Sequence, residues 1–90
     1  MEDFSVIYTG TLTNQDAELF NNAKGCIVKN LMVYNTQAQV AQLKLLFDDI
    51  EFSLELQQNE FKKIDILPFT KKIVANGNGI NIHASGLVIT

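Results

Sequence analysis

The stretch that decides the fold is IEFSLELQ, residues Ile50–Gln57, in which apolar and polar residues alternate strictly. Successive side chains of a β-strand point to opposite faces, so this period of two predicts a strand with one buried face and one exposed face. The preceding run, Ala41 to Phe47, repeats the pattern, and Asp48-Asp49 between the two runs fits a tight turn. The region therefore predicts a β-hairpin.

A helix is the alternative for part of this region. Residues 37–50 also place apolar side chains at helical spacing, and Ala, Gln, Leu and Lys favour helices. We prefer the hairpin because the stretch that follows has a strict period of two. The apolar residues at helical spacing are Val40, Leu43, Leu46, Phe47 and Ile50.

Further strands are expected on both sides of the hairpin. In residues 5–13, Val6, Tyr8 and Leu12 are expected to share a face. Residues 26–35 are apolar on both faces, as in a central strand covered on both sides, and residues 60–67 form a strand that Pro68 closes. Near the end of the chain, the alternation of residues 80–85 predicts a last strand.

Turn signals separate these strands. Asn76–Gly79 holds two Asn-Gly steps, which favour a hairpin because both central residues tolerate positive φ, and residues 21–25 and 35–37 are expected to be loops. The pattern predicts an all-β protein, a single domain over residues 1–90. We expect an antiparallel β-sandwich, immunoglobulin-like or jelly-roll-like, of about six to eight short strands. The structural turn residues are Gly25, Asn35, Asp48, Asp49, Gly77 and Gly79.

Composition excludes several classes of function. The 90 residues hold 47% apolar and 19% charged residues, so the chain is not of the disordered class. Its lysines are outnumbered by acids, for a net charge of −3, and it has no arginine, so no nucleic-acid partner is expected. No apolar run approaches the ~20 residues of a membrane span, so no membrane partner is expected. The start of the sequence, residues 1–4, is acidic and lacks a basic region with a long apolar stretch, so no secretory signal is expected.

Candidate chemical groups are few. Cys26 and His83 are each the sole residue of their kind, too few for a structural zinc set, and Cys26 lies in an apolar run typical of a buried thiol. A serine such as Ser85 would need His83 as its base and an orienting acid behind it. The acidic cluster at residues 48–51 matches no calcium loop. We therefore expect no catalytic, cofactor-binding or metal-binding residues.

Two lysine pairs flank Pro68. Lys62-Lys63 and Lys71-Lys72 are typical of solvated strand edges, where charge discourages pairing with another chain, although they could also contact an acidic partner.

The order of several segments carries a family resemblance. These segments are Tyr8–Leu12, Ala17–Phe20 leading to Lys24-Gly25, Ile27 to Asn35-Thr36, Leu43–Leu56, Ile66-Leu67-Pro68, and Gly77–Ile80 leading to Ala84-Ser85-Gly86. In this order the chain, from about residue 5 to 89, resembles a small β-sandwich module of tailed-bacteriophage structural proteins. It departs from that pattern at the turn Gln57–Asn59 and in residues 71–75.

The resemblance implies a non-enzymatic virion component, such as a capsid decoration, a head fibre, or a head–tail or tail accessory protein. Such a protein would be made in the host cytoplasm, assemble as a homo-oligomer, bind other virion proteins and need no cofactor. Apolar residues beyond those that one sandwich face must bury suggest an interface, although burial on both sides within one domain is the alternative. The candidate interface residues are Leu31, Met32, Val33, Tyr34 and Leu46.

The competing hypothesis is a module that binds a carbohydrate or a host surface. Sugar sites commonly stack rings on exposed aromatic side chains, and the absence of Trp counts against such a site. Tyr8 and Tyr34 both lie in expected strands, but either one exposed beside a groove would favour it. A hydrolase ranks third.

Overall fold

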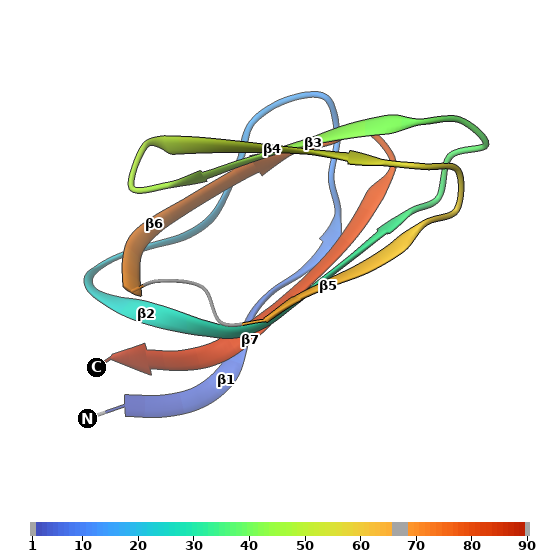
Figure 1. Ribbon diagram of the computed structural model, residues 1–90. Coiled ribbons are helices and arrows are strands. Elements are labelled where there is room, and N and C mark those ends of the chain that lie inside the picture. The colour runs from blue at the N-terminus through green and yellow to red at the C-terminus, as the bar shows by residue number, and fades with distance from the viewer. Residues whose placement is uncertain (1, 66–68, 90) are drawn as a thin grey trace.

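Seven antiparallel strands make up the chain in a computed structural model that describes residues 2–65 and 69–89 (Figure 1). The all-β prediction is confirmed. Residues 41–47, for which a helix was the alternative, form a strand. The strands are β1 (Glu2–Thr11), β2 (Ala17–Asn35), β3 (Ala41–Phe47), β4 (Ile50–Leu56), β5 (Phe61–Asp65), β6 (Phe69–Asn76) and β7 (Ile80–Ile89).

One long strand links the two layers of the sandwich. The hydrogen-bonded order is β1-β7-β2-β6-β3-β4, and β5 also pairs with β2. The first part of β2, Ala17–Ile27, pairs with β6, whereas its later part pairs with β7 and β5. One layer therefore holds β1, β7, the end of β2 and β5, and the other holds the start of β2, β6, β3 and β4 (Figure 1).

The prediction of a loop at residues 21–25 is wrong. Strand β2 runs through it, with a break in register between Asn21 and Cys26. Gly25 has a φ of +85°, a conformation that is easy only for glycine. The strand can therefore change direction here and pass from one layer to the other without ending.

The prediction that one face of β1 holds Val6, Tyr8 and Leu12 is wrong, because the strand contains a β-bulge. The register shifts between Val6 and Tyr8, so that Ile7 is an extra residue in this strand. Tyr8 packs against the core and Leu12 is buried, but Val6 is exposed. The three residues Val6, Tyr8 and Leu12 therefore do not share a face, because the bulge turns Val6 outward.

The hairpin predicted from residues 41–57 is present. Strands β3 and β4 pair from Ala41 with Leu56 to Phe47 with Ile50. Asp48 and Asp49 form the two-residue turn with φ values of 52° and 69°, both positive as a type I′ turn requires.

The second predicted hairpin is wrong, although its turn is present. Gly79 has a positive φ of 77°, and the amide of Ile80 donates to the carbonyl of Gly77 at 3.0 Å. The flanking strands β6 and β7 lie in different layers and do not pair with each other. The segment is an arch between layers, and its glycine amides donate instead to the carbonyls of Leu12 and Thr13, at 3.1 and 2.8 Å.

The remaining strand predictions hold with changed bounds. The strand expected at residues 60–67 is β5, Phe61–Asp65; Glu60 precedes the strand, and residues 66–68 lie outside the described residues. The end of β2 is central in its layer, but the described residues do not fully cover its outer face, since Tyr34 there is exposed.

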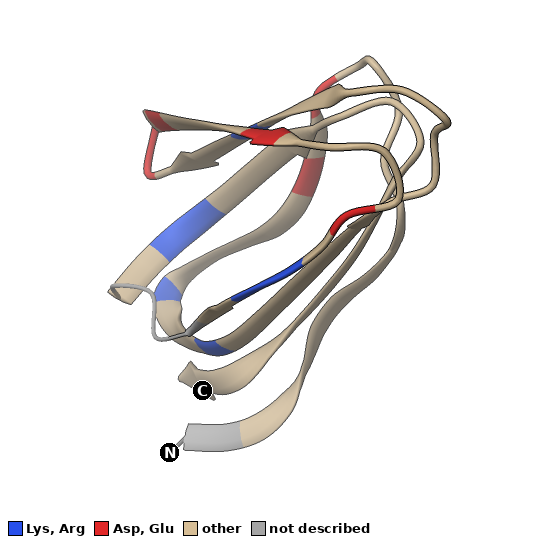
Figure 2. Ribbon diagram, turned by 45° about the vertical axis from the view of Figure 1, so that its right-hand side comes forward, with Lys and Arg blue, Asp and Glu red and all other residues tan. Residues whose placement is uncertain are grey.

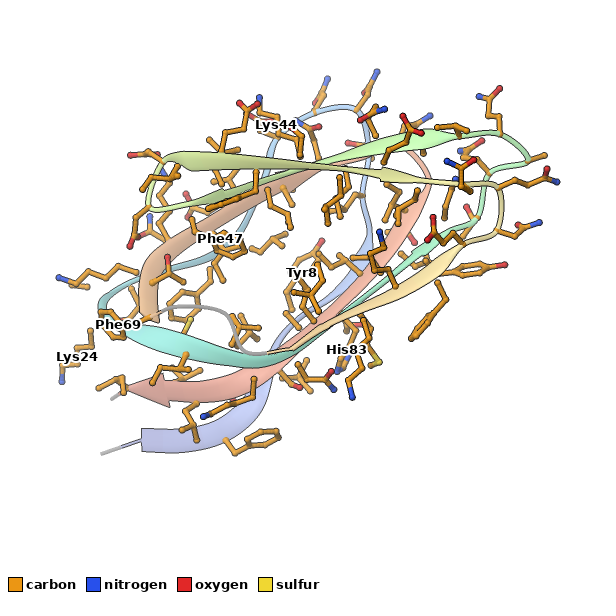
Figure 3. The ribbon with its side chains drawn as sticks, viewed as in Figure 1. Tyr8, Lys24, Lys44, Phe47, Phe69 and His83 are labelled. Atoms are coloured by element: carbon orange, nitrogen blue, oxygen red, sulfur yellow. The ribbon has the colours of Figure 1, made fainter. Side chains whose placement is uncertain are left out.

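The core lies between the two layers, where burial of apolar surface is the main stabilising contribution. Figure 3 shows Tyr8 and Phe47 pointing into this space and His83 on the outside of the β7 layer. Cys26 is fully buried, and this burial, together with the charge of Asp48, raises the pKa of its thiol to about 11. Other buried residues include Val28, Leu31, Val33, Leu43, Leu45, Leu56, Ile73, Ile80 and Ile82.

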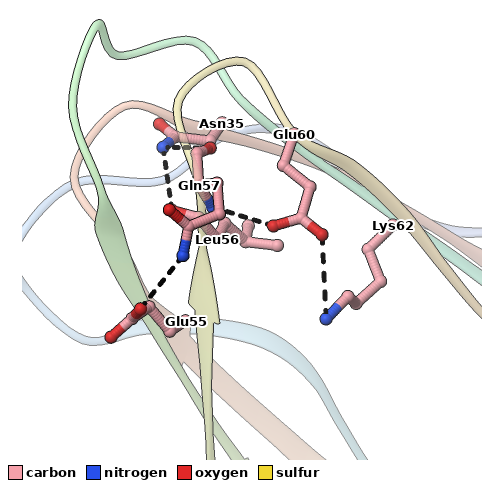
Figure 4. Close-up of polar contacts among 6 residues, drawn as sticks. All are labelled: Asn35, Glu55, Leu56, Gln57, Glu60 and Lys62. Atoms are coloured by element: carbon pink, nitrogen blue, oxygen red, sulfur yellow. Dashed lines mark hydrogen bonds and ion pairs between the residues drawn. The ribbon is translucent and has the colours of Figure 1, made fainter.

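Two polar side chains hold the hairpin in place. Fully buried Asn35 donates from its amide nitrogen to the carbonyls of Leu56 and Gln57, at 3.2 and 3.0 Å (Figure 4), and to the carbonyl of Gln39, at 2.8 Å. Its carbonyl oxygen accepts from the amide of Gln37 at 2.9 Å. Asn35 thereby ties the end of β2 to the end of β4.

At the opposite end of the hairpin, Asp48 binds the start of β6. Its carboxylate accepts from the backbone amides of Lys71 and Lys72, at 2.9 and 3.0 Å. The hydrogen bond from the amide of Lys71, with smaller contributions from Thr70 and Lys72, lowers the pKa of Asp48 although desolvation acts in the other direction. Asp48 is thus both a turn residue and the residue whose carboxylate joins the β3–β4 turn to the start of β6.

Candidate binding surface

A groove of about 370 Å³ lies on the outer face of the β7 layer. Strand register builds it from two rows of cross-strand neighbours, since directly opposed residues of antiparallel strands point to the same side. The first row is Thr11, Asn81, Tyr34 and Phe61, and the second contains Thr9, His83 and Met32.

The groove combines aromatic and polar groups. Tyr34 and Phe61 are exposed, by 37% and 58%. The hydroxyl of Tyr34 donates to the side-chain oxygen of Asn59 at 3.4 Å, and the hydroxyl of Thr11 donates to that of Asn81 at 2.6 Å. The floor therefore offers ring faces for stacking beside hydroxyl and amide groups that can bind a polar ligand.

Hydrolytic chemistry finds little support at this surface. His83 lines the groove, and no carboxylate is found among its described lining residues. Ser85 lies two residues further along β7 and is buried, and no hydrogen bond joins it to His83 among those found between described residues. Within residues 2–65 and 69–89, no group of three His, Cys, Asp or Glu side chains could hold a metal ion.

The predicted interface residues divide into two groups. Leu31 and Val33 are buried in the core, so burial within the domain accounts for them and they offer no surface to a partner. Met32 and Tyr34 alternate with them on the outer face and line the groove. Leu46 is half-buried on the outer face of β3, opposite Val74 of β6, away from the groove.

The chain also forms an apolar row that the sequence did not reveal. Phe4, Leu87, Ile27 and Phe69 are successive cross-strand neighbours on β1, β7, β2 and β6. Phe4 is 68% exposed and Phe69 50% exposed, while the other two are half-buried. These residues are far apart in the chain, so only the strand register brings them together.

Charged side chains are distributed unevenly over the strands. The β3–β4 hairpin holds four carboxylates, Asp48, Asp49, Glu51 and Glu55, against the single lysine Lys44. Figure 2 shows red segments on this hairpin and blue segments on β5, on β6 and at the bend of β2. The ion pairs found are long and exposed, such as Lys44 with Glu51 at 3.8 Å and Lys62 with Glu60 at 4.0 Å. Pairs of this kind contribute little to folding and leave the charges available to a partner.

Comparisons with known proteins found no matching family model, no matching curated protein and no matching solved structure. None of the described segments forms a helix long and apolar enough to cross a membrane.

Proposed function

We propose that this chain is a non-enzymatic structural protein of a tailed-bacteriophage particle. It acts by binding protein surfaces, as a homo-oligomer or as a decoration of the capsid or connector. The family resemblance in the order of its strands and turns motivates the placement in a virion, with synthesis in the host cytoplasm.

The observation that carries the protein-binding role is the exposed apolar surface. The apolar row presents Phe4 and Phe69 together on one face, and Val6 extends it along β1. Large apolar side chains that gather on a surface favour contact with another protein. The absence of an acid beside His83 among the described groove residues gives no comparable support to an enzyme.

The experiment is a protein inventory of purified particles. Tailed phage whose genome encodes this sequence would be banded by density and its proteins identified by mass spectrometry. The proposal predicts this chain in the intact particle band at a fixed ratio to the major capsid protein. Detection only in the unassembled lysate fraction would contradict a virion role.

A second function, binding of a carbohydrate, is favoured by one specific observation. Tyr34 is exposed beside a groove, next to Phe61 and the polar groups of Thr11, Asn81 and His83. Pyranose rings stack on aromatic faces while their hydroxyl groups bond to neighbouring polar groups, which is the composition of this groove.

The carbohydrate hypothesis is tested by titrating the protein with glucose, galactose and N-acetylglucosamine at millimolar concentration, followed by NMR of the backbone amides. Binding in the groove predicts shifts that cluster on Tyr34 and its neighbours. Tyr34→Ala should abolish these shifts and Tyr34→Phe should keep them, because the ring does the stacking. Shifts scattered over the surface, or unchanged in Tyr34→Ala, would contradict this function.

A further inference from the structure

Strands β4 and β5 border the same opening of the sandwich. The turn at residues 57–60 connects them. Asn35 holds both ends of this turn: its side-chain amide donates to the carbonyl of Leu56 at 3.2 Å, and its backbone amide donates to the carbonyl of Glu60 at 2.9 Å. Exposure along β4 rises away from this point, from 0% at Leu56 to 51% at Phe52 and 63% at Ile50. Figures 1 and 2 show the two strands diverging, one in each layer.

Each of these strands has an edge that the described part of the chain does not pair. Strand β4 pairs with β3 at the end of the strand order, and β5 pairs with β2 alone. An unpaired edge presents backbone donors and acceptors that can extend a sheet with a strand from another chain.

The inward face of β4 at this opening is also incompletely covered. Phe52 is paired with buried Leu45 and so lies on the core side of β4, and its ring centroid is 5.9 Å from that of Phe47. Half of its surface nevertheless remains exposed, as does most of Ile50. A strand added beside β4 would cover this surface as well as its backbone.

The two edges carry opposite charges. On the outward face of β4, Glu51 and Glu55 are exposed, and Asp49 continues the acidic row into the turn. The sequence of β5, Phe61–Asp65, holds two lysines, Lys62 and Lys63, against one acid, Asp65, so this strand has a formal charge of +1 whereas β4 has −2. Lys63 is exposed on the outward face, since it lies opposite Met32.

We propose that β4 of one copy pairs with β5 of a second copy, extending each sheet across the contact. This interface rests on the self-association in the proposed function and assigns it to two strand edges. In an antiparallel pairing with inward faces aligned, Lys63 of one copy lies opposite Glu51 or Glu55 of the other, or opposite Ser53 and diagonal to both glutamates. Ile64 of the second copy then covers the exposed side of Ile50 and Phe52.

Charge also decides against the alternative pairing of like edges. Two copies of β4 would set the row of Glu51 and Glu55 against itself, and two copies of β5 would bring Lys63 near Lys63 on the outward face and Lys62 near Lys62 on the inward face. Like charges on opposed strands are destabilising, so β4–β4 and β5–β5 pairings are disfavoured and the β4–β5 pairing is favoured. Because both edges border one opening, two copies can exchange both contacts and close as a pair.

The test is a set of charge reversals. One variant carries Glu51→Lys and Glu55→Lys, which makes both edges basic, and the other carries Lys62→Glu and Lys63→Glu, which makes both edges acidic. Self-association is followed by sedimentation velocity over a concentration series, with circular dichroism to confirm folding. We expect each variant to dissociate with a Kd higher by about tenfold or more, since two unlike pairs become like pairs.

Restoration is the decisive readout. An equimolar mixture of the two variants should associate as the wild type does, because every β4–β5 contact between them is again a pair of unlike edges. A single chain carrying all four reversals should also self-associate. The control, Lys24→Glu with Lys29→Glu, changes net charge as much as the β5 variant but lies on exposed positions of β2, and it should leave the Kd unchanged.

The outcomes separate this interface from the proposed function. A wild-type oligomer that neither charge variant weakens would overturn the edge contact while leaving self-association through another surface, such as the apolar row. Weakened variants whose mixture stays dissociated would also overturn it. A wild-type chain that remains monomeric would overturn both the interface and self-association, whereas the virion role depends on the particle inventory.

Discussion

Removal of the Asn35 side chain tests the polar support of the fold most directly. Asn35→Ala takes away four hydrogen bonds, to the carbonyls of Gln39, Leu56 and Gln57 and from the amide of Gln37. The contact with the Leu56 carbonyl is buried, whereas the other three groups are near enough to the surface to be reached by water.

The magnitude follows from this division. A buried carbonyl left without its donor costs about 1–3 kcal/mol, and the three other bonds lose roughly 0.5 kcal/mol each once water replaces them. The expected loss is therefore about 2–5 kcal/mol, out of about 5–13 kcal/mol of total stability for a chain of this length. In urea this corresponds to a midpoint lower by about 1–3 M.

The assay is equilibrium unfolding in urea followed by far-ultraviolet circular dichroism. Asn35→Asp, which has the same shape but sets a carboxylate against three carbonyls, should be at least as unstable as Asn35→Ala. The control is Gln42→Ala, whose hydrogen bond to Glu55 is exposed at 3.1 Å and should matter by no more than about 0.5 kcal/mol. If Asn35→Ala shifts the midpoint no further than this control, the reasoning is refuted.

Three further predictions concern Asp48, Gly86 and Cys26. The pKa of Asp48 is lowered in the folded state, so the stability that its carboxylate contributes is present above the ordinary pKa of 3.8 and is lost as the pH falls through the lower folded pKa. Below about pH 4, the urea midpoint should therefore drop less in Asp48→Asn than in the wild type. Gly86→Ala should destabilise by about 1–3 kcal/mol in the same assay, because the added methyl group meets the backbone of Ile27, and equal midpoints would contradict this close approach. Buried Cys26 should resist an aromatic disulfide reagent at pH 8 until the chain unfolds, and rapid native labelling would show that it is accessible.

Local pattern predicted β1, the later part of β2, β3, β4, β5 and β7, because alternation and turn chemistry act over neighbouring residues, but it did not predict β6 or the start of β2. The hairpin around Asp48-Asp49 is the clearest case, since apolar alternation on both sides and two residues tolerant of positive φ agree. The same kind of signal misled at Asn76–Gly79, where the turn formed but its flanking strands found partners in different layers. Turn residues specify a change of direction and not which strands pair.

Features that depend on long-range register could not be predicted. The groove unites Thr11, Asn81, Tyr34 and Phe61 from four strands, and the apolar row unites four others, through pairings that no local pattern specifies. Gly25 was expected to lie in a loop because glycine and asparagine there are typical of turns, yet backbone pairing on both sides carried β2 through the bend. Burial of Leu31 and Val33 likewise required knowing which face of β2 the second layer covers.

The solution mass of the purified chain, measured by light scattering behind size exclusion from low micromolar to millimolar concentration, tests the central claim that this protein works by associating with protein surfaces, its own included. The account predicts a dimer or larger defined oligomer whose fraction rises with concentration. A mass of one chain at every concentration would contradict self-association.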